Sequence, residues 1–171
     1  MDERLNWTLP SLYSTKTLSN EEIDKALNIG VGLDKLYEHQ KLSSEQIDRA
    51  LEKGEDIYYL YEYQKLSPKQ IDMAIEKGKN LNQLYFNHEL SSEQIDRTLN
   101  VNSDNWNLCA LYYKQKLTSN QINKALAIGN DLDDLYEHQT LTDRQIVEAL
   151  RKGENLDELY KYQKLTQKHI D

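Results

Sequence analysis

The chain has 171 residues, the size of one domain, and its 21 lysines and arginines against 29 acidic residues give a formal net charge of -8. This balance argues against nucleic acid and membranes as partners, because both attract clustered positive charge. The single cysteine, Cys109, excludes an intramolecular disulfide and a cysteine zinc cluster, and no apolar run approaches the about 18 residues of a membrane span. Since the first residues also lack the pattern of a signal peptide, we expect a cytoplasmic protein.

One short motif recurs along almost the whole sequence. Successive copies begin 24 residues apart, except for a step of 27 between the fourth and the fifth. Their first residues are Leu18, Leu42, Leu66, Leu90, Leu117, Leu141 and Leu165. We therefore expect a single repeat domain over residues 1–171, with a half-repeat or cap over 1–17, six repeats over 18–164 and a partial repeat over 165–171. The fourth repeat carries the three extra residues.

Each repeat opens with the signature of an α-helix. A serine or threonine is followed three residues later by glutamate or glutamine, as in Ser43 and Gln46, which is the pattern of a capping box. Ile47 and Leu51 then lie on one helical face, and Gly54 fits the left-handed residue that ends a helix. The acids and amides at the capping position are Glu22, Gln46, Gln70, Gln94, Gln121 and Gln145.

The second half of each repeat predicts a shorter α-helix, in which Leu156, Leu159 and Tyr160 show helical spacing. We expect side chains just before this helix to cap its start. The expected caps are Asp56, Asn80, Asp131 and Asn155. One such helix pair buries too little apolar surface to fold alone, so neighbouring pairs must stack. The predicted fold is therefore all-α, an α-solenoid of stacked 24-residue helix pairs.

The pattern L-[ST]-x-x-Q-I-D-x-A-L resembles two groups of short helical repeats. One is the leucine-rich-repeat-variant type, and the other is the "LTPEQIDKAL" repeat of bacterial and phage proteins. The resemblance covers about residues 5–171 and implies stacked helices without a particular activity. The second half of the repeat departs from it, because Leu-Tyr-x-x-Gln replaces a basic, alanine-rich pattern. Variant repeats have a 3₁₀ second helix, whereas here we expect an α-helix.

The sequence contains no constellation typical of an enzyme. Five of the six glycines stand at the helix-stop position, and no phosphate-binding glycine motif is present. His39 and His138 share a repeat position but lie four repeats apart, too far to share a metal ion. Cys109 has no histidine in local register, which favours a partly buried free thiol over a nucleophile. We therefore expect no catalytic residue, no cofactor and no metal site.

Three ladders of side chains recur at fixed repeat positions. The tyrosine ladder, expected to form core and contacts between repeats, is Tyr13, Tyr37, Tyr61, Tyr85, Tyr112, Tyr136 and Tyr160. The glutamine ladder, expected to bond loop amides between layers, is Gln40, Gln64, Gln115, Gln139 and Gln163, with His88 in the third repeat. The aspartate ladder, expected to be solvated, is Asp24, Asp48, Asp72 and Asp96. The alternatives are a ligand-lining row of tyrosine and glutamine, and a functional acidic stripe.

Residues that break the repeat are the candidates for function, because the architecture does not require them. Tyr58 and Tyr59 replace a polar pair, and with Tyr63 and Phe86 they suggest an aromatic surface patch. The insertion in the fourth repeat adds Asp104 and Trp106. An exposed tryptophan is a typical interface anchor, although Trp106 folding back over a gap is an equal alternative. We also expect Trp7 to cover the open N-terminal face.

The favoured function is a non-enzymatic protein–protein interaction module. A specific form is an acidic inhibitor from a phage or mobile element that blocks a bacterial defence protein with a basic surface. One alternative is a solenoid that binds a small ligand or nucleotide through the tyrosines and glutamines. Another is an acidic mimic that blocks a nucleic-acid-binding surface without contacting nucleic acid. Self-association through the apolar end residues Leu165 and Ile170 is the remaining option.

Overall fold

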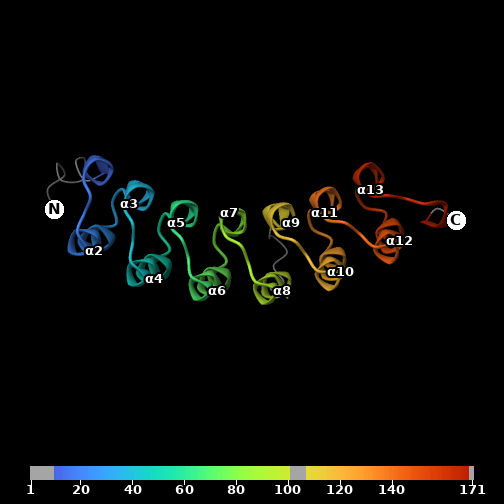
Figure 1. The fold of residues 1–171 in the computed structure, drawn as a ribbon, viewed down its shortest axis with the longest axis horizontal. Coiled ribbons are helices and arrows are strands. Elements are labelled where there is room, and N and C mark those ends of the chain that lie inside the picture. The colour runs from blue at the N-terminus through green and yellow to red at the C-terminus, as the bar shows by residue number, and fades with distance from the viewer. Residues whose placement is uncertain (1–9, 101–106, 170–171) are drawn as a thin grey trace. The chain divides into compact units, whose positions relative to one another are not determined.

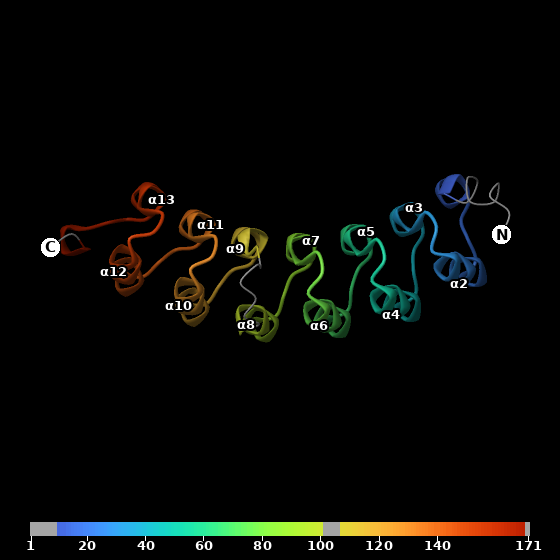
Figure 2. The same cartoon turned by 180° about the vertical axis from the view of Figure 1, so that it is seen from behind.

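A computed structural model describes residues 10–100 and 107–169, and every regular element within those ranges is helical. The chain divides into two compact units, Met1–His88 and Glu89–Asp171. Figures 1 and 2 show the helices from opposite sides. Each unit is built from the helix pairs that the 24-residue repeat predicts, so the all-α solenoid expected from the sequence is confirmed.

The first unit holds a short helical segment over residues 10–15 and three helix pairs. The pairs are α2 (Asn20–Ile29) with α3 (Leu33–His39), α4 (Ser44–Lys53) with α5 (Ile57–Tyr63), and α6 (Pro68–Lys77) with α7 (Leu81–Asn87). The first helices α2, α4 and α6 pack in one row, and the second helices α3, α5 and α7 pack in another (Figure 1).

The second unit repeats this arrangement. Its elements are α8 (Ser92–Asn100), α9 (Cys109–Lys114), α10 (Ser119–Ile128), α11 (Leu132–His138), α12 (Asp143–Lys152) and α13 (Leu156–Tyr162), followed by the 3₁₀ turn η1 (Gln167–His169). Here α8, α10 and α12 form the row of first helices, and α9, α11 and α13 form the row of second helices (Figure 1). The second helices of both units are α-helical, as expected.

The predicted caps of the first helices are present. In α4, the Ser43 hydroxyl accepts from the Gln46 backbone N–H at 3.3 Å, and the Gln46 Oε1 accepts from the Ser43 N–H at 2.9 Å. The helix ends at Gly54, whose φ of 68° lies in the left-handed region that favours glycine. These local rules explain why the same helix forms in every repeat.

The expectation for the start of the second helices is wrong. Asp56, Asn80, Asp131 and Asn155 make no side-chain cap hydrogen bond. Instead each adopts a left-handed backbone, with φ between 47° and 50°. Aspartate and asparagine tolerate this conformation better than other residues with a Cβ, which accounts for their presence. In the first repeat Gly32 takes the same place, and a Cβ there would lie 2.7 Å from the Pro10 Cγ.

The tyrosine ladder is core, as predicted. Six of its members are at most 1% exposed: Tyr13, Tyr37, Tyr61, Tyr85, Tyr112 and Tyr136. Tyr160 is 53% exposed, because only the turn η1 follows its helix pair among the described residues. The Tyr37 hydroxyl donates to the Glu55 carbonyl in the turn of the next repeat, at 3.5 Å. Burial raises the pKa of Tyr136 to about 12.

The glutamine ladder ties consecutive repeats together, also as predicted. Gln64 donates from Nε2 to the Tyr37 and Gln40 carbonyls and accepts from the Leu42 N–H at 3.1 Å. One buried amide therefore satisfies two carbonyls of the preceding repeat and the N–H that opens its own repeat. In the third repeat His88 replaces this amide, and its Nε2 bonds the Tyr61 carbonyl at 3.0 Å.

Candidate functional site

Three of the four tyrosines of α5 are exposed, because the buried positions of this helix are taken by Ile57, Leu60 and Tyr61. Ile57, Leu60 and Tyr61 face the core and are at most 2% exposed. Tyr58 and Tyr63 are each 44% exposed, and Tyr59 is 38% exposed. We call these three side chains the α5 tyrosine patch. The exposure predicted from the sequence is confirmed.

Two rings of this patch contact each other. The centroids of Tyr58 and Tyr59 are 5.1 Å apart, and the ring planes meet at 76°, an edge-to-face pair. Both residues lie in the first turn of α5, and the exposed acids Glu55 and Asp56 precede this helix. The edge-to-face contact leaves ring surface on both tyrosines open to solvent.

Tyr63 lies at the other end of α5, beside an ion pair of α3. The Lys35 Nζ is 2.6 Å from the Glu38 Oε2, and this contact lowers the pKa of the Glu38 carboxyl. Partial burial raises the pKa of the Tyr63 hydroxyl, and the charges of Glu62 and Glu38 raise it further. Of the charged groups around Tyr63, Lys35 and Glu38 are therefore already paired with each other.

Phe86 lies on the neighbouring helix α7 and is 50% exposed. It occupies the repeat position that Glu38 and Glu62 hold in α3 and α5. Since α5 and α7 pack together, Phe86 extends the aromatic character of this row of helices. Asp104 and Trp106 lie outside the described residues, as does Trp7.

Side chains of the aspartate ladder accept hydrogen bonds from the next repeat, which was not predicted from the sequence. The Gln70 Nε2 donates to the Asp48 Oδ1 at 2.7 Å, across the gap between α6 and α4. Asp24 accepts from both Gln46 and Arg49, at 3.0 and 2.8 Å. These carboxylates therefore bond the next repeat, which weighs against a free acidic stripe.

The thiol of Cys109 is in a poor position for nucleophilic chemistry. Burial, with the nearby carboxylates of Asp134 and Asp131, raises its pKa to about 12. A thiol of this pKa is almost entirely protonated at neutral pH. No group of three or more metal-ligating side chains occurs in the described part of the chain.

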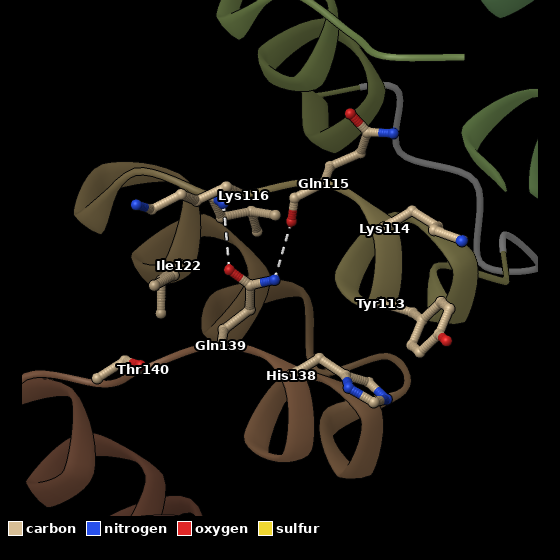
Figure 3. Close-up of a pocket in the computed structure, with 9 residues that line it drawn as sticks. Tyr113, Lys114, Gln115, Lys116, Ile122, His138, Gln139 and Thr140 are labelled. Atoms are coloured by element: carbon tan, nitrogen blue, oxygen red, sulfur yellow. Dashed lines mark hydrogen bonds between the residues drawn. The ribbon is translucent and has the colours of Figure 1, made fainter. Parts of the chain in front are cut away.

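A cleft of about 370 Å³ lies between the ends of α9 and α11 (Figure 3). Gln139 crosses it, donating to the Gln115 carbonyl at 2.9 Å and accepting from the Leu117 N–H at 3.1 Å. Lys114 and Lys116 project to opposite sides of Gln139 (Figure 3), so their charges do not converge. The amide that spans the cleft is already satisfied, and the cleft offers no focused site for an anion.

A second cleft, of about 510 Å³, separates α10 from α12. Between α2 and α4 the same gap is crossed by Arg49 on Asp24. In the sixth repeat Glu148 takes the place of Arg49. It bonds Arg151 of its own helix at 2.7 Å and forms no bridge to α10. Val147 is 49% exposed there. The sequence signal for this cleft is that Asn123 and Val147 stand where the aspartate ladder has aspartate.

No described helix is long and apolar enough to cross a bilayer. No protein-family model, no curated protein and no solved structure matches the chain.

Proposed function

We propose that this chain is a non-enzymatic, protein-binding repeat module, and that the α5 tyrosine patch is its main contact surface. The observation that carries the proposal is the position of Tyr58 and Tyr59. Both are exposed, and the fold does not need them, since four other repeats form the same helix with polar residues there. The corresponding residues are Asp34 and Lys35, Asn82 and Gln83, Asp133 and Asp134, and Asp157 and Glu158.

The chemistry of the patch supports a protein partner. Tyrosine offers a large, rigid contact area together with a hydroxyl, and it is enriched among the residues that dominate binding energy. A helical row in a stacked-repeat protein also presents side chains at regular intervals to an extended partner. Phe86 on α7 places a further exposed ring on the same row.

The ladders carry less weight as a functional surface. The tyrosine ladder is buried, and Gln64 and Gln139 already bond the backbone of neighbouring repeats. A small ligand would have to break these bonds to reach them, which weighs against the ligand-binding alternative. The engaged carboxylates of Asp24 and Asp48 weigh similarly against an acidic mimic built on that ladder.

The experiment begins with affinity capture from nuclease-treated bacterial lysate, using three baits: wild type, Tyr58→Leu/Tyr59→Leu, and Tyr160→Leu. Tyr160 is the matched control, since it is a comparably exposed tyrosine in the other unit. Retained proteins are identified by mass spectrometry, purified and titrated against each bait. We expect one partner that binds wild type and the control equally and the double variant weakly. Equal binding to all three baits would contradict the proposal.

A further inference from the structure

Two exposed tyrosines of the second unit, Tyr113 and Tyr162, have a lysine close to the ring. The Lys114 Nζ lies 5.1 Å from the Tyr113 ring centroid, and the Lys161 Nζ lies 4.5 Å from the centroid of Tyr162. Both distances are within the range of a cation–π contact. In each case the cation is the residue adjacent to the tyrosine in sequence, so the chain itself supplies it.

The α5 tyrosine patch has no such cation on its own helix. The sequence of α5, IYYLYEY, contains no lysine or arginine. Of the lysines that flank the helix pair, Lys53 donates to the Leu27 carbonyl, and Lys79 lies beside Gly54 at the end of α4. On the neighbouring helix α3, Lys35 is paired with Glu38. Each of these three lysines therefore lies against another part of the chain.

Carboxylates instead lie close to these tyrosines in the sequence. Glu55 and Asp56 stand three and two residues before Tyr58, and Glu62 lies one helical turn after it on the same side. All three acids are exposed. Open aromatic surface beside uncompensated carboxylates is the environment that a guanidinium group prefers, since it stacks on a ring while it donates to an acid.

Resting on the proposed function, we propose that the partner presents a basic segment whose arginine stacks on Tyr58 or Tyr59 and donates to Glu62 or Asp56. Arginine fits better than lysine, because its planar group satisfies the ring and the carboxylate together. Tyr63 contributes mainly apolar contact, since Lys35 and Glu38 already act on it. The surface thus selects for positive charge in a chain of net charge -8.

The probe is a displayed library of short random peptides, selected on wild type and counter-selected on Tyr58→Leu/Tyr59→Leu. Leucine keeps an apolar side chain and favours the helix but removes the ring. Tyr160→Leu serves as the control, and thermal unfolding checks that all variants fold. We expect the patch-dependent peptides to be enriched in arginine. Patch-dependent peptides without such enrichment would overturn this inference and leave the proposed function standing, whereas no patch-dependent peptide would overturn both.

The best peptide is then tested with its arginine replaced by citrulline, which has nearly the same shape without the charge. We expect citrulline to weaken binding about tenfold, the size of one good cation–π contact with a carboxylate partner. Glu62→Gln is expected to weaken binding and to reduce its dependence on salt. Equal affinity for the arginine and citrulline peptides would overturn the assignment of a cation to this surface.

Discussion

Gln70 donates from Nε2 to the Asp48 Oδ1 at 2.7 Å while its Oε1 accepts from the Ser67 N–H at 2.9 Å. One side chain therefore caps its own helix and bonds the helix of the preceding repeat. This double role explains why glutamine stands at the capping position of every repeat from the second to the sixth. In the first repeat Glu22 takes this place, and its carboxylate bonds Lys16 and the Ser19 N–H instead.

The first prediction follows from this pair. Gln70→Glu keeps the cap but removes the donor and places a carboxylate against Asp48, so we expect the unfolding free energy to fall by about 2 kcal/mol at neutral pH. Urea denaturation monitored by circular dichroism measures the change. The control is Glu22→Gln, which we expect to change stability little. An unchanged midpoint for Gln70→Glu would show that the bond to Asp48 is not stabilising.

The second prediction concerns the glutamine ladder. Gln139→Leu leaves the Gln115 and Tyr112 carbonyls and the Leu117 N–H without their partner. Buried backbone groups without partners are costly, so we expect a loss of about 3 kcal/mol or more in urea denaturation. A cost below that of an ordinary surface substitution would contradict the role assigned to the ladder.

The third prediction is a pH dependence centred on His88, which stands in the glutamine ladder. Burial lowers the pKa of His88 below its ordinary value of 6.5. The unfolded chain therefore takes up a proton first as the pH falls, so the stabilising contribution is present above about pH 6.5 and is lost below it. We expect His88→Gln to be more stable and to show a smaller decrease between neutral and mildly acidic pH. Parallel pH profiles for the two proteins would contradict this.

The fourth prediction separates two explanations for Asn80. Its backbone is left-handed, with φ at 49°, and its side chain makes no cap bond. Asn80→Gly should therefore leave the thermal midpoint nearly unchanged, whereas Asn80→Ser should destabilise by about 1 kcal/mol. If the side chain were a helix cap, the order would be reversed, since serine caps well.

The helices themselves were predictable because their signals are local. Ser43, Gln46 and Gly54 specify the start and end of the 10-residue helix α4 from within the helix and its two caps. Asn80 was misinterpreted because helix caps and left-handed turns favour the same residue types. The bond from Gln70 to Asp48 joins two repeats, so the local pattern of one repeat did not reveal it.

The candidate surface was predictable in part. Departure from the repeat identified Tyr58, Tyr59, Tyr63 and Phe86 as exposed, and the structure confirms their exposure. The ring contact of Tyr58 with Tyr59, and the ion pair beside Tyr63, depend on side-chain geometry and on packing between helices. The clefts between α9 and α11 and between α10 and α12 also depend on how helices of neighbouring repeats pack, so the sequence did not predict them.

The central claim is that the α5 tyrosine patch binds a protein partner. The most direct measurement is calorimetric titration of the purified partner into wild type, Tyr58→Leu/Tyr59→Leu and Tyr160→Leu. We predict that the double variant binds at least about tenfold more weakly than wild type, as expected for the loss of two exposed aromatic anchors, and that the control is unchanged. The same dissociation constant for all three proteins would contradict the claim.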